Sequence, residues 1–250
     1  MAQVSGATIL HLDGAICAAW SDASRGDLRP GGPGPDDGEP LIRLAAEVAR
    51  STGGTLDRVA WLTQVHGTVV RDVPCDAPSS GGPVPCHLGA GDALVSARPG
   101  VALCVLTADC APVALASPEG VFAAVHAGWR GLLDGVIERT VAHMRRAGAT
   151  AVTAALGPCI HPGCYEFGDD ALGRVADAYG DGVRARTTDG HTALDLPAAV
   201  SAAATVAGAR MVGGVDACTA CGGGRYSHRA RADTGRQALL VWSTAARGTR

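Results

Sequence analysis

The chain of 250 residues contains neither lysine nor asparagine, so all 21 of its basic side chains are arginines. It can therefore have no catalytic lysine and no phosphate-binding P-loop, whose motif requires one. No apolar run reaches the roughly 18 residues of a membrane-spanning helix. The N-terminal stretch MAQVSGATILHLDGA also lacks the basic start and the long apolar core of a signal peptide. We therefore expect a cytoplasmic protein that does not bind membranes.

The net charge of −3 at pH 7 argues against a nucleic-acid partner, because such proteins present a strongly basic face. Hydrophobic residues make up 47% of the chain, which is enough to build a core. The nine cysteines are odd in number and irregularly spaced. They do not fit a disulfide scaffold, which usually occurs in short secreted chains. We expect most of them to be buried and a few to act as ligands or nucleophiles.

Hydrophobic periodicity predicts one domain over residues 1–250 that mixes strands and helices, of the α/β or α+β class. Helical spacing of apolar residues predicts helices over 41–50, 132–146, 169–179 and from the N-cap Asp195 to about 207. Short apolar runs predict strands over 59–65, 68–73, 93–96, 101–107, 112–116, 121–126, 151–156, 211–215 and 237–242. Stretches rich in Gly and Pro predict loops over 22–40 and 74–91.

Three polar side chains stand where predicted strands end. His66 follows one strand, Cys110 lies just beyond a second, and His126 ends a third. Open sheets place their ligand sites at strand ends. Two imidazoles and one thiolate form a plausible zinc set that leaves a fourth position for water or substrate. Their spacing along the chain matches no zinc-finger signature, so the residues alone also allow three unrelated strand-end side chains.

Basic side chains suggest anion binding at two places. Arg130, in HAGWRG, stands at the start of a predicted helix, where the helix dipole attracts phosphate. His228, Arg229, Arg231 and Arg236 cluster in SHRARADTGR, and guanidinium groups bind phosphate or carboxylate bidentately. Both groups are equally consistent with a solvated surface.

The remaining polar motifs contain cysteine. Cys218 and Cys221 form a CxxC pair, which is typical of redox centres and of half a zinc ribbon. The chain has no second CxxC pair and no thioredoxin-like pattern around this one, so we interpret the pair as structural. Cys159 and Cys164, in GPCIHPGCYEFG, flank a loop that either lines a pocket or simply packs.

Five stretches carry specific motifs in combination: TQVHG, GDALVSARPGVALCVLTADCAPV, VFAAVHAGWRG, LGPCIHPGCYEFG and CTACGGGRYSHRARADTGRQALLVW. Together they resemble the YfiH/YlmD family, also called laccase-domain or multicopper polyphenol oxidase-like proteins, over roughly residues 57–243. The resemblance implies a single-domain, YfiH-like α/β/β/α sandwich. It also implies a metal site, usually zinc, made by His66, Cys110 and His126.

The resemblance further implies an enzyme. Members of the family are described as purine nucleoside phosphorylases with adenosine deaminase activity, and bacterial members as peptidoglycan editing factors. We therefore expect a zinc-dependent enzyme that phosphorolyses adenosine or inosine and deaminates adenosine, with His66, Cys110, His126 and Asp109 as its catalytic set. Asp109 is a candidate proton shuttle, or a residue that orients a histidine. The family pattern also supports substrate-binding roles for Gln64, Arg130, Cys159, His228 and Arg229.

Three alternatives remain open. Cys110 and His126 could be the nucleophile and base of a metal-free amidase that edits peptidoglycan precursors. Copper at the same three ligands could support weak polyphenol oxidation, although a true multicopper oxidase needs His-x-His pairs and the eight histidines form none. A non-catalytic zinc-binding module would need a fourth protein ligand, for which Cys159 is the first candidate.

The N-terminal segment departs from the family. Many members carry a GGVS…NL stretch, where this chain reads SDASRGDLRPGGPGP. If that segment binds substrate, the specificity of this chain differs from that of its relatives. We expect its partners to be small molecules, a purine nucleoside and phosphate, and its assembly to be a monomer or a homodimer.

Overall fold

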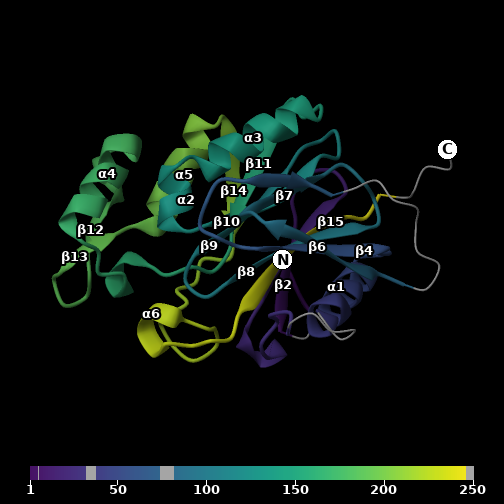
Figure 1. Cartoon of the computed structure of the whole chain (residues 1–250), viewed down its shortest axis with the longest axis horizontal. Coiled ribbons are helices and arrows are strands. Elements are labelled where there is room, and N and C mark those ends of the chain that lie inside the picture. Colours follow the sequence, from purple (N-terminus) through teal and green to yellow (C-terminus); the bar gives the residue numbers. More distant parts are fainter. Residues whose placement is uncertain (5, 32–37, 74–81, 246–250) are drawn as a thin grey trace.

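The computed structural model describes residues 1–4, 6–31, 38–73 and 82–245. Two β-sheets lie face to face, and helices cover their outer faces (Figure 1). Helix α1 (Glu39–Ser51) packs on one side, whereas α3 (Val136–Arg146) and α5 (Leu196–Val206) pack on the other. This α/β/β/α arrangement confirms the predicted fold class.

Each sheet mixes parallel and antiparallel pairs. The first has the strand order β1-β2-β3-β15-β8-β4-β6 and the second β14-β11-β9-β10-β7-β5. The strands of the first sheet are β1 (Ala2–Val4), β2 (Ala7–His11), β3 (Ile16–Ser21), β4 (Arg58–Thr63), β6 (Val84–Ala90), β8 (Val101–Thr107) and β15 (Gln237–Ser243). Those of the second sheet are β5 (Val70–Asp72), β7 (Ala93–Ser96), β9 (Ala111–Ala116), β10 (Phe122–Ala127), β11 (Val152–Leu156) and β14 (Ala209–Gly214).

Apart from the helix α4 (Asp169–Tyr179), the remaining elements are short. They are the helices α2 (Trp129–Leu133) and α6 (His228–Arg231), and the hairpin of β12 (Arg184–Arg186) and β13 (Thr192–Leu194). The hairpin lies beside α4, at the left of Figure 1. Turns of 3-10 helix cover Ala23–Arg25, Pro162–Cys164 and Asp181–Val183. Among the described residues, no helix combines the length and apolar character needed to cross a bilayer.

The central strands are apolar on both faces because each sheet is covered on both sides, whereas the edge strands β1, β5, β6 and β14 are partly exposed. In β8, Ala102 and Cys104 point toward the α1 side, whereas Leu103 and Val105 join the layer between the sheets. This alternation is the period of two that a pleated strand imposes on its side chains. Such strands contain near-continuous apolar runs, which is why most of them could be predicted from the sequence.

The candidate site residues lie where the chain passes from one sheet to the other. The connection between β4 and β5 carries His66, and the connection between β8 and β9 carries Cys110. His126 lies on β10, which pairs with both β7 and β9 in the second sheet. The edge between the two sheets thus collects polar residues from three separate parts of the chain.

Two predicted elements are corrected by the structure. The helix predicted over 132–146 is two helices, α2 and α3, because Gly135 adopts a left-handed conformation with φ of 86° and breaks the helical path. The loop predicted over 74–91 contains the strand β6, while residues 74–81 lie outside the described residues. Pro85 misled the prediction, because an edge strand such as β6 tolerates a proline.

The N-terminal region also differs from the expectation. The strands β1, β2 and β3 were not predicted. The predicted loop 22–40 contains a 3-10 turn and the start of α1, and its residues 32–37 lie outside the described residues. The Asp195 N-cap is confirmed, since its carboxylate accepts a hydrogen bond of 2.8 Å from the backbone N–H of Ala198.

Candidate metal centre

His66, Cys110 and His126 come together at the edge between the two sheets. One potential ligand atom from each residue lies within 4.8 Å of those of the other two. The rings of His66 and His126 meet edge to face, with centroids 4.9 Å apart and planes at 74°. The strand-end pattern in the sequence therefore corresponds to a true spatial cluster.

The backbone around the cluster holds unusual conformations. His66 and Asp109 have φ values of 58° and 96°, in a region that residues other than glycine rarely adopt. Such conformations cost free energy and persist only where the surroundings enforce them, which occurs most often at functional sites. Here they turn the chain sharply at the two connections between the sheets.

Asp92 is the residue that orients the cluster, and the sequence analysis did not identify it. Its carboxylate is fully buried and accepts a hydrogen bond of 2.8 Å from Nδ1 of His126. It also accepts the backbone N–H groups of His66 at 2.9 Å and of Gly67 at 2.7 Å. One carboxylate thus fixes the ring of His126 and the backbone at His66, and it leaves Nε2 of His126 as the ring nitrogen available to a ligand.

These hydrogen bonds keep Asp92 ionised. Burial raises the pKa of its carboxyl group, but the hydrogen bonds from His126 and Gly67 and the charge of His126 outweigh burial, so this pKa is lowered.

Cys110 and His126 shift each other's protonation. Burial raises the pKa of the Cys110 thiol, but the charge of His126 and hydrogen bonds to His126 and His66 lower it to about 6. Burial also lowers the pKa of His126, yet the charge of Cys110 and the hydrogen bond to Asp92 raise it to about 9. The metal-free protein therefore holds a thiolate–imidazolium pair at neutral pH. A thiolate is the form that binds metals and attacks electrophiles.

Two glycines of HAGWRG let the chain pass close to the cluster. A Cβ on Gly128 would lie 2.7 Å from Cδ2 of His66 and 3.2 Å from Sγ of Cys110. A Cβ on Gly131, in α2, would lie 2.6 Å from the carbonyl oxygen of Gly67. A larger residue at Gly131 would push α2 away from the turn that carries His66, whereas one at Gly128 would meet the side chains of His66 and Cys110.

Gly128→Ala is expected to weaken zinc binding while the fold survives. The His66 side chain is exposed and can swing away from the new methyl group, but a displaced ring no longer points at the cluster. We expect zinc affinity to fall about tenfold or more, measured by competition with a chromophoric chelator. Gly182→Ala is the control, since a Cβ there meets open space. Unchanged affinity in Gly128→Ala would remove His66 from the ligand set.

A cavity of about 520 Å³ opens beside the cluster, and all three cluster residues line it. This volume lies in the range of roughly 300–1,000 Å³ that is typical of small-molecule sites. Its walls are strongly cationic, because Arg29, Arg130, Arg229 and Arg236 line it against a single carboxylate, Asp109. Such walls favour an anionic ligand.

Aromatic rings support part of this wall. Arg130 stacks over the ring of Trp129, with its Cζ 4.4 Å from the ring centroid. Arg229 stacks in the same way over Tyr165 at 4.9 Å. Stacking holds the planar guanidinium groups in place. One N–H group of Arg229 also donates to the backbone carbonyl of Glu166 at 2.7 Å, and its other N–H groups have no such partner within the described residues. Within the described residues, the Arg130 guanidinium has no hydrogen-bond partner of its own.

Four of the five predicted substrate-binding residues line the cavity: Gln64, Arg130, His228 and Arg229. The amide of Gln64 is already used, since it donates to the carbonyl of Leu106 at 2.7 Å and accepts from its N–H at 2.8 Å. Cys159 is buried and is not among the residues that line the cavity. The structure thus gives no support to substrate contact by Cys159.

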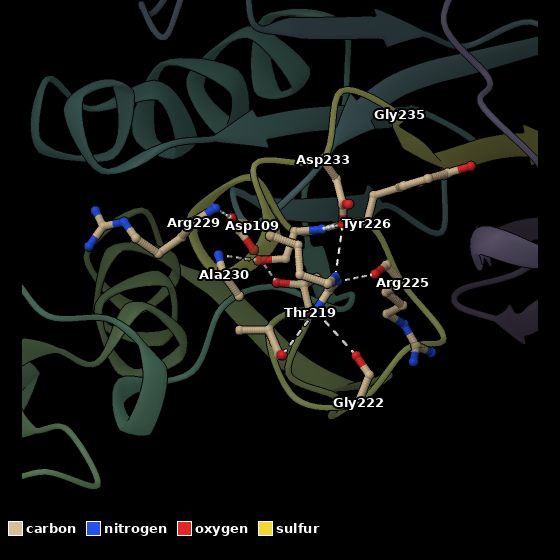
Figure 2. A network of polar contacts seen from close by, with 12 residues as sticks. Asp109, Thr219, Gly222, Arg225, Tyr226, Arg229, Ala230, Asp233 and Gly235 are labelled. Atoms are coloured by element: carbon tan, nitrogen blue, oxygen red, sulfur yellow. Dashed lines mark hydrogen bonds and ion pairs between the residues drawn. The ribbon is translucent and has the colours of Figure 1, made fainter.

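Asp109 accepts hydrogen bonds from two separate parts of the chain at the cavity wall, as Figure 2 shows. One oxygen accepts the hydroxyl of Thr219 at 2.6 Å and the other accepts the backbone N–H of Arg229 at 2.7 Å. The histidine-orienting role considered for Asp109 thus belongs to Asp92. Arg231 does not line the cavity, and its guanidinium donates to backbone carbonyls of the loop that precedes α6, including those of Thr219 and Gly222.

The sequence analysis missed other residues that line the cavity. Arg29 comes from the predicted N-terminal loop, and Trp129, Tyr165 and Thr107 come from element ends. The Thr107 hydroxyl is shielded from solvent and has no hydrogen-bond partner within the described residues. Trp129, Tyr165 and Thr107 lie within the quoted motifs, but the motifs do not show which side chains face the cavity, since that depends on the packing of segments that are distant in the sequence.

The donor set fits a zinc ion. Two imidazoles and one thiolate are ordinary zinc ligands, and a carboxylate on the far nitrogen of a ligand histidine is a usual companion. No fourth His, Cys, Asp or Glu of the described residues joins the cluster, Cys159 included. A site with three protein ligands keeps one position open, which is typical of catalytic rather than structural zinc.

Fold and cavity together define an α/β/β/α protein with a His–Cys–His cluster between its sheets. The family model described as multi-copper polyphenol oxidoreductase laccase matches residues 30–244. The chain therefore belongs to this laccase-like YfiH family, as its motifs predicted. A solved structure of YfiH from Bacillus licheniformis has a TM-score of 0.72 at 23% identity and covers 91% of this chain and 92% of its own. YlmD from Geobacillus stearothermophilus gives 0.71 at 25% identity, covering 92% and 93%.

Curated relatives in the family have names that state an activity. A protein of Streptomyces coelicolor named purine nucleoside phosphorylase is 39% identical over 219 residues, which cover 86% of this chain and 88% of the relative. A protein of Corynebacterium glutamicum with the same name is 35% identical over 210 residues, 83% of each chain.

Proposed function

We propose that this protein is a purine nucleoside phosphorylase that also deaminates adenosine and holds zinc with His66, Cys110 and His126. The observation that carries the proposal is that this His–Cys–His cluster opens into a cavity lined by four arginines. The names of the relatives support the same activity. A small anion and a nucleoside are the two substrates that such a cavity suits.

Phosphorolysis requires phosphate to be held beside the sugar. A phosphate oxygen forms a bond to C1′ of the ribose, and the bond from C1′ to the base nitrogen breaks. The electron pair of the broken bond leaves with the base, which then takes up a proton. The products are the free base and ribose 1-phosphate. Arg130 and Arg229 supply charge and bidentate donors for the phosphate. Trp129 and Tyr165 provide apolar ring faces for the nucleoside.

Deamination requires water to replace the amino group at C6 of adenine, giving inosine and ammonia. A zinc ion held by the cluster would supply Lewis acidity and a nucleophile at neutral pH. Asp92 keeps His126 in the required tautomer and orientation. Asp109 acts as a positioning residue, because both of its carboxylate oxygens hold the wall that carries Arg229.

Arg130→Ala is expected to raise the KM for phosphate by one to two orders of magnitude with a smaller change for the nucleoside. The reason is the loss of a charge-assisted hydrogen bond of about 1.5–3 kcal/mol. Initial rates with inosine at varied phosphate measure it. Arg139→Ala, an exposed arginine that does not line this cavity, serves as the matched control. An unchanged KM for phosphate would move the anion site away from Arg130.

The proposal is tested by product analysis with adenosine and inosine, with and without phosphate. We expect ribose 1-phosphate and free base only when phosphate is present, and inosine from adenosine in either case. If neither nucleoside is consumed by the zinc-loaded protein, the proposed function is wrong.

One observation favours a second candidate function, a Cys–His amidase. Cys110 and His126 lie close together in the cluster and each favours the charged form of the other, as in such a nucleophile and base. The two candidates differ in the role of the metal, because zinc on the sulfur would block its attack on a substrate.

Alkylation of Cys110 separates the two candidates. In chelator-treated protein, we expect the rate of iodoacetamide labelling to rise with pH around 6, where this thiol ionises, rather than near its usual value of about 8.5. Adding zinc should suppress the labelling, as followed by peptide mass spectrometry. Labelling that is equally fast with and without zinc would favour the amidase.

A further inference from the structure

A second group of thiols lies outside the cavity. Cys164 ends the 3-10 turn Pro162–Cys164, while Cys218 and Cys221 belong to the loop between β14 and α6. The three sulfurs lie within 4.8 Å of one another, and those of Cys164 and Cys221 are 3.4 Å apart although the residues are 57 positions apart in sequence. The missing partner of the CxxC pair is thus a single cysteine from a distant loop.

The spacing of these sulfurs fits a bound metal. Thiolates at about 2.3 Å from a tetrahedral zinc are about 3.8 Å from one another. The sulfurs of Cys164 and Cys221 are 3.4 Å apart and all three lie within 4.8 Å of one another, so small movements suffice to reach that spacing. A disulfide instead needs about 2.05 Å between its sulfurs. Cys164, Cys218 and Cys221 are all partly or fully exposed, so a metal can reach them from solvent.

The backbone around Cys218 favours its thiolate. The N–H of His161 donates to its sulfur at 3.4 Å. Burial raises the pKa of Cys218, but N–H groups of His161, Cys221 and Ala220 outweigh burial and lower it. Outer donors of this kind are usual around metal-binding thiolates, where they spread the negative charge.

We propose that Cys164, Cys218 and Cys221 form a second zinc site, separate from the cluster in the cavity. Its three thiolates leave the fourth position to water or to a small thiol. Three soft sulfur ligands select zinc over magnesium or calcium.

A metal at the second site would hold in place two loops that form part of the cavity wall. Cys218 is joined to Cys159 by a β-bridge, and its neighbour Thr219 donates to Asp109. On the other loop, Tyr165 follows Cys164 directly and stacks against Arg229. A metal between the two loops would therefore fix Tyr165 and Asp109, the two supports of Arg229, relative to one another.

The test uses the full chain with the first cluster removed by His66→Asn and Cys110→Ala. In this background, elemental analysis gives the number of zinc ions that each chain retains after gel filtration. In a second measurement, Cd²⁺ is added stepwise and its binding is followed by the charge-transfer absorption between cadmium and thiolate. We expect one metal ion per chain and the absorption of three thiolates. Adding Cys221→Ser, at an exposed position, should weaken cadmium binding about a hundredfold. Cys86→Ser, outside the cluster, is the matched control and should leave binding unchanged.

The outcomes are distinct. If the reduced and folded background protein binds neither ion, or binds cadmium equally after Cys221→Ser, the proposal is wrong. A disulfide between Cys164 and Cys221 found by mass spectrometry in zinc-supplemented protein would also overturn it, in favour of a redox pair. Thermal melting of each variant shows whether it is folded, and in the Cys221→Ser variant the exposed position makes folding the expected result.

Discussion

His66→Asn is expected to abolish zinc retention at the cavity cluster and to lower kcat/KM for inosine phosphorolysis by about three orders of magnitude. That is the loss of about 4 kcal/mol of transition-state stabilisation, the contribution expected of a bound metal ion. Asparagine tolerates the left-handed backbone of position 66 better than most residues, so the turn keeps its conformation. Zinc content and initial rates measure the two effects.

The same variant separates the zinc enzyme from the amidase. His66→Asn leaves Cys110 and His126 in place, so a metal-free Cys–His enzyme would keep most of its activity on its own substrate. His191→Asn, at an exposed histidine in a turn, is the matched control and should retain both zinc and activity. Full phosphorolysis by His66→Asn would contradict the role of the cluster.

Asp92→Asn is expected to be the most damaging change outside the ligands. The amide presents one NH₂ group where the carboxylate accepted N–H donors from Gly67, His66 and His126, so at least one buried donor loses its partner. We expect the free energy of unfolding to fall by about 3 kcal/mol and zinc affinity to fall about 10- to 100-fold. Denaturant unfolding of the metal-free protein and chelator competition measure these changes.

The pH dependence of unfolding gives an independent test of Asp92. Its pKa is lowered in the folded protein, so its contribution to stability is present above its ordinary pKa and is lost as the pH falls through the lowered value. In Asp92→Asn, the free energy of unfolding should therefore decrease less as the pH falls than it does in the wild type. Asp189→Asn, at an exposed turn, should leave this pH dependence unchanged. If the free energy of unfolding of Asp92→Asn decreased with falling pH as it does in the wild type, Asp92 would not be the ionised carboxylate that accepts the hydrogen bonds of the site.

The sequence predicted the cluster of three polar residues because strand ends mark where polar groups interrupt buried runs. His66, Cys110 and His126 were recognisable from the residues, and their family motifs then fixed them as a set. Asp92 left a weaker signal, a single acidic residue directly before the buried strand β7. A buried carboxylate requires donors, but the sequence could not say that those donors come from the turn at His66 and from β10.

Contacts between distant loops were beyond prediction. Cys164 lies beside the CxxC pair, and Arg29 lines the cavity, only because the fold brings together segments that are distant in the sequence. Arg29 is brought there because Asp27 accepts the backbone N–H of Arg236 at 3.0 Å. The break at Gly135 was missed for another reason, since the apolar period continues through it while the backbone does not. Periodicity shows which face is buried, but not whether the helix axis is continuous.

Inosine turnover during removal and return of zinc tests the central claim most directly. Protein treated with chelator, then resupplied with zinc, is assayed with and without phosphate by chromatography of base and ribose 1-phosphate. The account predicts that turnover requires phosphate, disappears with the metal and returns when zinc is added, and that His66→Asn shows no such recovery. Turnover that persists without zinc, or that recovers equally in His66→Asn, would contradict it.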